Sequence, residues 1–390
     1  MNTKFQPVSL QDWEQTVLKQ LKTDDIYSIL EKENLEGLQI RPYYASSVHA
    51  MPTLPKVEES THLVSPFCEE WQDEAYAFLL KQNITGLENK TFFIDHPELA
   101  EHIIPEDSNA YLCLIDIADD NAGTLNLQLG KELLAKGFDR SLCVDISFHQ
   151  NAGAGIVQQL AFALGKAKEL TEVFGPQVLD QLVFRMATGA NYFFEIAKIR
   201  AFKILFNQFS KEFGRDDIPY IFAETSLRNK SLHDEENNLI RSTLELAAAM
   251  IGGADAVYSN SYKIENASPL SDEISFKQQI VLAYESIINV FQDAASGSYY
   301  VEELTHQMAE KAWDYFLKTE ESGGYLASVR NGKIQKAVYE HAVAEQQWVE
   351  EGKIKLVGVN IYPKLELKKP AAELYSEYEL KPVRWAEAYE

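Results

Sequence analysis

His149 is the residue whose type and position come nearest to a pattern of catalytic chemistry. It lies in ISFHQNAGAG, residues 146–155, after the β-forming run RSLCVDIS and before a glycine-containing turn and a helical pattern. Enzymes built on a parallel barrel place catalytic groups just past the carboxyl end of a strand, so this spacing suits a catalytic histidine. The alternative is a histidine at the barrel rim that hydrogen-bonds a neighbouring carbonyl group.

A metal site at the same place would need further ligands close to His149. Asp145 and Glu224 each lie in a strand-like run, and carboxylate and imidazole groups together can bind a metal ion. They belong to two different strands, so the sequence does not show that they converge, and we expect no metal site. Neither a phosphate-binding loop nor a Ser-His-Asp signature stands out elsewhere.

Strands and helices alternate from residue 60 onward, which predicts an α/β fold with a parallel sheet. Eight strand-like runs are separated by helical patterns, and eight is the strand number of a (β/α)8 TIM barrel. The predicted strands cover residues 62–67, 90–96, 110–117, 141–147, 181–187, 219–225, 256–261 and 354–360. The predicted helices cover residues 71–83, 124–137, 155–170, 192–209, 237–252, 277–291, 301–319, 323–331 and 333–352.

The chain divides into an N-terminal arm and linker (1–60), the barrel (61–363) and a C-terminal tail (364–390). The arm contains the amphipathic segment SLQDWEQTVLKQL, in which Ser9 is placed to cap a helix. Its apolar residues have no core of their own, so we expect the arm either to pack on a partner chain or to fold back along its own barrel. These residues are Trp13, Leu18, Leu21, Ile26, Tyr27, Leu30 and Leu35.

Composition excludes several classes of partner. The formal net charge is −23 at pH 7, which disfavours nucleic acid and anionic membrane surfaces. The three cysteines show no CxxC spacing, and Cys113 and Cys143 lie in apolar runs, which indicates buried free thiols. The N-terminus is polar and no apolar stretch is long enough to span a bilayer, so we expect a cytoplasmic protein.

Several segments between residues 190 and 360 follow one another in a recognisable order. They are ANYFFEIAKIRAFKILF, ETSLRNKSLHDEENNLIRSTLELAAAMIGGADAVYSNSY, DAASGSYYVEELTHQMAEKAWDYF, GGYLASV and KLVGVNIY. In this order and spacing they resemble the barrel domain of the methylmalonyl-CoA mutase family. Upstream, NAGAGIVQQLAFALG resembles a helix of the same barrel, whereas residues 1–140 match weakly. The resemblance implies a barrel that encloses an acyl-CoA under a separate cobalamin domain, and radical rearrangement of carbon skeletons.

The site positions depart from the catalytic pattern of that family. Catalytic members carry YHMQEAGA, and an alignment without a gap places Ser147 and Phe148 at the Tyr and His positions, whereas a one-residue gap places Phe148 and His149 there. Either way the tyrosine hydroxyl is missing. The gap-free alignment is preferred, and it leaves His149 at a position of no known role, so we favour the rim histidine.

Other positions also depart from the catalytic pattern of the family. Where catalytic members read HCQTSGWS, this chain reads FAETSLRN, so Phe222 replaces the histidine and Glu224 replaces the glutamine. An ionised carboxylate accepts but does not donate hydrogen bonds, and it would repel an anionic substrate. The first strand offers Glu69 and Glu70 in place of Arg and Tyr, and DAASGSYY keeps residues 297–300 but lacks the family's Trp. We expect Phe148 and Phe222 to fill the barrel.

The resemblance therefore implies the barrel of a methylmalonyl-CoA mutase small subunit. Such a chain is expected to be non-catalytic and to support, as a heterodimer, a large subunit that interconverts methylmalonyl-CoA and succinyl-CoA. The alternative is an active acyl-CoA mutase barrel that works with a separate cobalamin-binding chain. No DxHxxG motif occurs, so we expect adenosylcobalamin in the partner subunit and no cofactor on this chain. The ending RWAEAYE resembles the start of the family's linker helix, as in a fragment of a longer subunit.

Overall fold

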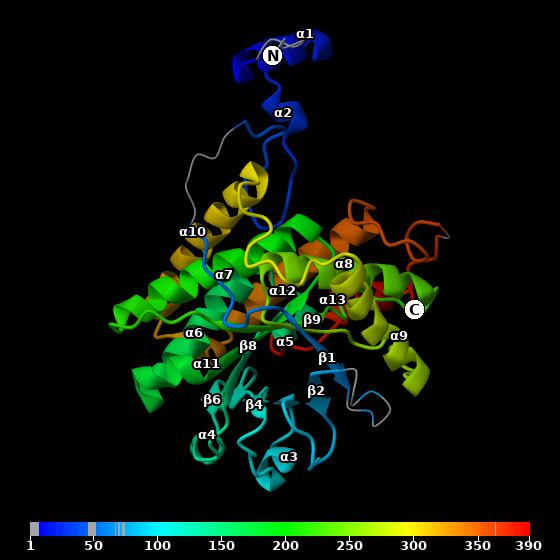
Figure 1. Cartoon of the computed structure of the whole chain (residues 1–390). Coiled ribbons are helices and arrows are strands. Elements are labelled where there is room, and N and C mark those ends of the chain that lie inside the picture. Colours follow the sequence, from blue (N-terminus) through cyan, green and yellow to red (C-terminus); the bar gives the residue numbers. More distant parts are fainter. Residues whose placement is uncertain (1–7, 46–51, 67, 69–70, 72–74, 363) are drawn as a thin grey trace, which may run out of the picture.

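The computed structural model describes residues 8–45, 52–66, 68, 71, 75–362 and 364–390. Eight parallel strands form one sheet in the order β4-β3-β2-β1-β10-β9-β8-β7. Isolated bridges from Leu112 to Arg140 and from Asp116 to Cys143 bring the edge strands β4 and β7 together. The result is the predicted TIM barrel, nearly closed (Figure 1). The strands are β1 (His62–Pro66), β2 (Ala77–Leu80), β3 (Thr91–Ile94), β4 (Ala110–Cys113), β7 (Leu142–Asp145), β8 (Leu182–Thr188), β9 (Tyr220–Thr225) and β10 (Ala256–Tyr258).

One predicted strand is wrong and one real strand was predicted as a helix. Residues 354–360 form a turn with a single bridge between Val357 and Ile361, and they lie outside the barrel sheet. The missing barrel strand is β2, within the segment 71–83 that we expected to be helical. All four residues of β2 are buried, so the strand shows no alternation of polar and apolar positions. A short, continuous apolar run cannot be assigned by periodicity alone.

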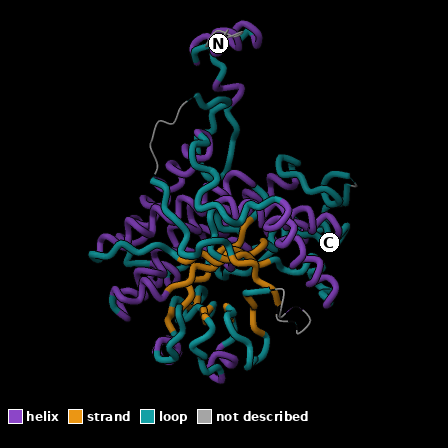
Figure 2. The backbone as a smooth tube through the Cα atoms, in the orientation of Figure 1, coloured by secondary structure: helices purple, strands orange, loops and turns teal. Residues whose placement is uncertain are grey.

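Among the described residues, long helices cover one part of the barrel and leave another part without them. The residues 81–90 that join β2 to β3 contain no helix, whereas α6, α7 and α8 follow β7, β8 and β9 (Figure 2). The helices of the barrel are α3 (Pro97–His102), α4 (Leu127–Leu134), α5 (Ser147–Ala152), α6 (Ile156–Phe174), α7 (Tyr192–Glu212), α8 (Glu236–Gly252), α9 (Pro269–Ile280), α10 (Tyr299–Glu321), α11 (Tyr325–Arg330) and α12 (Lys333–Glu350). A π-helical turn, Val281–Glu285, extends α9, and the predicted helix over 277–291 ends there. A short hairpin, β5 (Ala118–Asp119) and β6 (Thr124–Leu125), precedes α4.

Side chains fill the interior of the barrel. Phe222 is 0% exposed, and its ring lies 4.9 Å from that of Phe93 and 6.3 Å from that of Tyr258. Tyr220, one inward position below Phe222 on the same strand, belongs to the same buried cluster. The expected filling of the barrel is thus confirmed for Phe222. It is wrong for Phe148, because β7 ends at Asp145 and the ring, carried by α5, packs in the helical layer outside.

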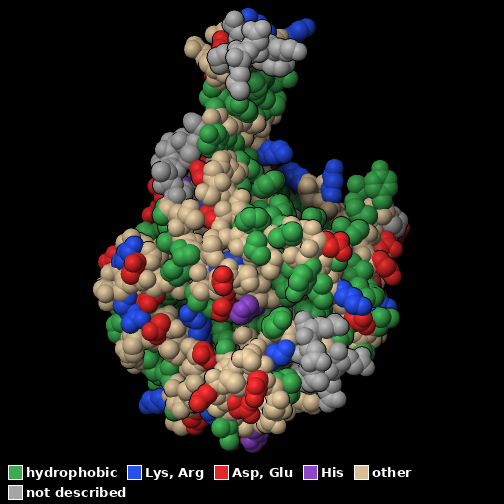
Figure 3. All heavy atoms as spheres, in the orientation of Figure 1, with side chains coloured by type: hydrophobic (Ala, Val, Ile, Leu, Met, Phe, Trp, Pro, Cys, Tyr) green, Lys and Arg blue, Asp and Glu red, His purple; other side chains and the backbone are tan. Residues whose placement is uncertain are grey.

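The N-terminal arm projects from the barrel and then returns to it (Figure 1). Its helix α1 (Leu10–Leu21) begins with the predicted capping box of Ser9 and Asp12, and α2 (Tyr27–Leu30) follows. No side chain of α1 is buried, and hydrophobic side chains gather along the neck below it (Figure 3). By contrast, Leu38 is buried in the main core. The part of the arm around Leu38 therefore packs on its own barrel, whereas α1 projects away from it.

The C-terminal tail packs against α12 through 3₁₀ turn Trp385–Ala388 and short helix α13 (Ala371–Leu374). The indole N–H of Trp385 donates to Glu345 Oε2 at 2.9 Å. Leu356 and Val359, which were predicted to lie in a barrel strand, belong instead to the hydrophobic cluster between α12 and the tail. Cys113 and Cys143 are buried free thiols, as predicted. The boundaries proposed at residues 60 and 363 remain predictions.

Candidate functional site at the carboxyl end of the barrel

The predicted site residues fall into two groups at the carboxyl ends of β7 and β9. Ser147, Phe148 and His149 lie on α5, immediately after β7, whereas Phe222 and Glu224 lie on β9. Ser147 has a local role, because its Oγ donates to Asp145 Oδ1 at 2.7 Å and its backbone N–H donates to the same oxygen at 2.8 Å. The side chain therefore fixes the turn between strand and helix.

His149 is fully buried and belongs to a chain of hydrogen bonds. Its Nε2 lies 2.6 Å from the hydroxyl of Tyr325, which donates its single proton to Asp120 Oδ1 at 2.8 Å. The imidazole, the phenol and the carboxylate thus form one continuous hydrogen-bonded chain. Burial lowers the pKa of His149 to about 4, so the ring is neutral near pH 7. We favoured a histidine at the barrel rim bonded to a carbonyl group, whereas the structure places His149 in the core with Tyr325 as the hydrogen-bond partner of its Nε2.

A buried lysine joins this chain to the loop after β4. Lys166 Nζ lies 2.6 Å from Asp116 Oδ2 and 2.8 Å from Asp120 Oδ2. Burial raises the pKa of Asp116 to about 6, although the ammonium group of Lys166 opposes the shift. Phe148 lines an open acidic hollow next to these carboxylates. The sequence analysis missed this cluster, although a lone lysine within the apolar run LAFALGKA is a signal of a buried ion pair.

The mouth of the barrel interior carries a second ion pair. Glu224 Oε2 accepts from Arg185 Nη2 at 2.7 Å and from Arg185 Nε at 3.1 Å, and the neighbouring strands β8 and β9 bring the two together. The guanidinium group of Arg185 offsets the repulsion of an anionic substrate that we expected from Glu224. The sequence analysis also missed Arg185, a charged residue inside the apolar run QLVFRMA.

The structure does not assemble the metal site that we weighed. Glu224 is held by Arg185, His149 by Tyr325, and Asp145 by Ser147. Within the ranges that the structure describes, no group of three or more His, Cys, Asp or Glu side chains is arranged to hold a metal ion.

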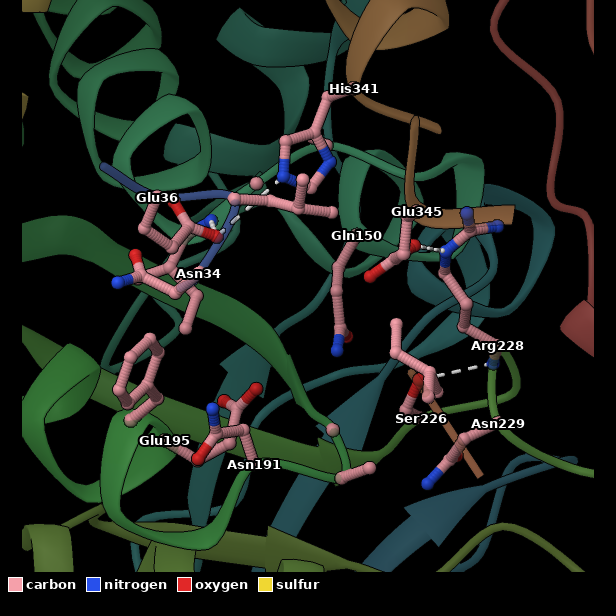
Figure 4. Close-up of a pocket in the computed structure, with 18 of the residues that line it drawn as sticks. Asn34, Glu36, Gln150, Asn191, Glu195, Ser226, Arg228, Asn229, His341 and Glu345 are labelled. Atoms are coloured by element: carbon pink, nitrogen blue, oxygen red, sulfur yellow. Dashed lines mark hydrogen bonds and ion pairs between the residues drawn. The ribbon is translucent and has the colours of Figure 1, made fainter. Parts of the chain in front are cut away.

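A cavity of about 450 Å³ lies beside this mouth, under α12 and the arm (Figure 4). Gln150, from α5, extends into it, is 7% exposed, and its Oε1 has no hydrogen-bond partner among the described residues. Glu36 from the arm and His341 from α12 close one side, and Asn191 stands at the start of α7. Nothing in the sequence pattern predicted this cavity, because its walls come from parts of the chain that are far apart in sequence. They include residues 33–36, 154–156, 189–195, 226–229 and 341–348.

The other predicted positions have simpler outcomes. Glu69 and Glu70 lie outside the described residues. Gly297 has φ +84°, which favours glycine, and it precedes the start of α10 as a turn residue should. Tyr300 is used in packing, with its ring 5.3 Å from that of Tyr44 in the arm and 5.5 Å from that of Phe193.

Comparison with known proteins places this architecture in one family. The family model described as methylmalonyl-CoA mutase matches residues 140–386, more than half of the chain. The chain is 33% identical to methylmalonyl-CoA mutase of Rhizobium meliloti over 253 residues, which cover 61% of this chain and 35% of that protein. It is 32% identical to the methylmalonyl-CoA mutase small subunit of Porphyromonas gingivalis over 226 residues, covering 55% and 37%. It is 31% identical to the large subunit of Propionibacterium freudenreichii subsp. shermanii over 233 residues, covering 57% and 32%.

These matches span about a third of the length of each relative. The match to the family model begins at residue 140, just before β7, so β1 to β4 lie outside it. The matched part contains α5, β9 and the cavity walls from α6 to α12. The fold and the match over residues 140–386 together establish that the chain belongs to the methylmalonyl-CoA mutase family.

Proposed function

We propose that this chain is the barrel of a methylmalonyl-CoA mutase small subunit that is itself non-catalytic. The observation that carries the proposal is the filled barrel interior, with Phe222 packed between Phe93 and Tyr258. The family resemblance implies that a catalytic barrel encloses its acyl-CoA. Within the described residues, aromatic rings at this depth, topped by the Arg185–Glu224 ion pair, occupy the space that such a substrate would need.

The rival function is an active acyl-CoA mutase barrel that works with a separate cobalamin-binding chain. Its support is the 33% identity to a relative named simply methylmalonyl-CoA mutase. It requires a histidine near the reacting atoms. His149 is the histidine nearest the family motif, and its Nε2 is already bonded to Tyr325. The ring is also fully buried and has a pKa of about 4, which does not suit proton transfer near pH 7.

We further propose that adenosylcobalamin is bound by a large subunit, which interconverts methylmalonyl-CoA and succinyl-CoA. The mouth residues of this chain do not suit the cofactor, because the ring of Phe222 has no donor for it and Glu224 is committed to Arg185. Two sources of relatives, Porphyromonas gingivalis and Propionibacterium freudenreichii subsp. shermanii, each have a small and a large subunit. These pairs support a heterodimer, for which we propose a cytoplasmic location. Among the described residues, no helix is long and apolar enough to cross a membrane.

The arm offers a surface for the partner. Helix α1 has no buried residue, although Leu10 and Leu21 are apolar, and the ring of Trp13 lies 5.4 Å from that of Tyr43 in the same arm. Association with another subunit would remove this apolar surface from water.

Co-expression with the large subunit from the same organism tests the proposal. We expect the two chains to co-purify, and we expect turnover from the complex but not from this chain with added adenosylcobalamin. Deletion of residues 1–30 removes α1 and α2 but keeps Glu36 and Leu38, and it should weaken capture of the large subunit. Turnover by this chain together with an isolated cobalamin-binding chain would favour the rival function, and unchanged capture by the truncated chain would exclude the arm from the interface.

A further inference from the structure

The segment 33–38 of the arm lies along one side of the cavity, and the carboxylate of Glu36, near its middle, binds the start of α6. Glu36 Oε1 accepts from the backbone N–H of Ile156 at 2.7 Å, and Oε2 accepts from that of Val157 at 3.0 Å. These are the first two N–H groups of α6, a 19-residue helix, and they have no partner within the helix itself. A carboxylate at this position also interacts favourably with the helix dipole.

The segment is shaped to present this one side chain. The Asn34 side chain bridges the loop, because its Oδ1 accepts from Leu38 N at 2.9 Å and its Nδ2 donates to Leu38 O at 2.6 Å. Leu38 is buried in the main core, and Gly37 has φ +65°. Glu36 thus lies at the tip of a braced loop between these residues.

The barrel surface around Gly155 leaves just enough room for the carboxylate of Glu36. A Cβ atom at Gly155 would lie 2.8 Å from Nε2 of His341 and 3.0 Å from each oxygen of Glu36, so any larger residue would displace one of them. His341 Nδ1 lies 2.8 Å from the carbonyl oxygen of Gly153, and its Nε2 lies 3.8 Å from Glu36 Oε1. The close fit depends on glycine at position 155, which has an ordinary φ of −65° and needs no glycine for backbone reasons.

We propose that residues 33–38 are a latched strap that controls access to the cavity around Gln150, with Glu36 as the latch. Four consecutive residues of the strap, 33–36, line the cavity, and Figure 4 shows Glu36 and Asn34 on one side with Gln150 extending between them and Arg228. The rest of the hold lies at the end of the strap and just beyond it. Leu38 and Ile40 pack in or against the main core, and Gln39 exchanges two hydrogen bonds with Gln307, from its N–H to Oε1 at 2.8 Å and from Nε2 to its carbonyl oxygen at 3.2 Å. Releasing the Glu36 carboxylate would therefore let residues 33–37 move away from α6 while Leu38 stays in the core.

Two variants release the latch by different routes, and a third is the matched control. Glu36→Gln keeps the size of the side chain but removes its charge and one acceptor. Gly155→Ala leaves Glu36 intact but fills the space that it needs. Glu33→Gln changes an exposed glutamate of the same strap that also lines the cavity. Circular dichroism and thermal unfolding establish that all three variants are folded.

The first readout is amide hydrogen exchange at Ile156 and Val157, with Leu164 in the middle of α6 as an internal reference. Exchange at the first two should be about tenfold faster or more in Glu36→Gln and Gly155→Ala, because hydrogen bonds to a charged acceptor are lost. The second readout is the rate at which N-ethylmaleimide labels a cysteine at position 150, introduced as Gln150→Cys, measured by peptide mass spectrometry. That rate should rise with the exchange rate in both latch variants and stay at the parental value in Glu33→Gln.

Faster exchange without faster labelling would show that Glu36 merely caps α6, and it would overturn the strap. So would equal acceleration by Glu33→Gln, or no change in either latch variant. If Glu36→Gln lowers the stability of the whole chain, Leu164 will exchange faster as well, and Gly155→Ala, which keeps all the charges, then decides.

Discussion

Truncation of Phe222 to alanine probes the filled barrel, on which the proposed loss of catalysis depends. The ring is 0% exposed and is held by strands on all sides, so the site has little freedom to collapse after truncation. Truncating a buried Phe to Ala costs about 3–5 kcal/mol of unfolding free energy. Aromatic pairs at 4.9 Å and 6.3 Å, with Phe93 and Tyr258, each contribute about 0.5–1.5 kcal/mol beyond area burial, so we expect the upper half of that range.

The assay is equilibrium unfolding in urea, followed by tryptophan fluorescence and by far-ultraviolet circular dichroism. Coincident transitions from the two probes justify a two-state analysis, and the midpoint shift then gives the change in free energy. Phe291→Ala is the matched control, because the ring of Phe291 is 50% exposed and its loss should cost less than about 1 kcal/mol. A cost below about 1 kcal/mol for Phe222→Ala would refute the reasoning, since it would mean that the ring is not packed inside the barrel.

The remaining predictions concern activity and the buried charges. The purified chain should show no turnover of methylmalonyl-CoA with added adenosylcobalamin, and measurable turnover by the chain alone would contradict its proposed non-catalytic role. Lys166→Met should cost about 3–5 kcal/mol in urea unfolding, because it leaves Asp116 and Asp120 buried without their cation, and a neutral result would mean that water reaches the carboxylates. The pKa of His149 is about 4 in the folded chain and 6.5 ordinarily, so the unfolded chain binds the proton first as pH falls. The free energy of unfolding should therefore decrease by about 3 kcal/mol as pH falls from above 6.5 to below 4. Asp116, with a pKa raised to about 6, changes stability with pH in the opposite sense. The contribution of His149 is therefore measured as the difference in unfolding free energy between wild type and His149→Gln at each pH. A difference that stays constant between pH 7 and pH 4 would disprove the prediction.

The alternation of strands and helices was enough to predict the barrel, because a parallel sheet needs a crossover between consecutive strands and its apolar runs are visible in one dimension. Seven strands and the long helices α6, α7, α8, α10 and α12 are where the pattern placed them. The eighth strand was misplaced because β2 and the turn at 354–360 are both short apolar runs. Only the sheet, by pairing β2 with β1 and β3, decides which one is a strand.

The sequence by itself also determined which polar positions of the family motif are lost, since Phe222 is a phenyl ring in any fold. It could not determine what the substituted residues do. The sequence does not show a partner for Glu224, because Arg185 lies 39 positions away and reaches it only when β8 and β9 pair. Lys166 meets Asp116 and Asp120 only where α6 packs beside the loop after β4, and Glu36 reaches Ile156 across 120 positions. The sequence shows residue types and the local spacing of apolar residues. The partner of a buried charge depends instead on which segments the packed core brings within about 3 Å of it, and only the tertiary structure decides that.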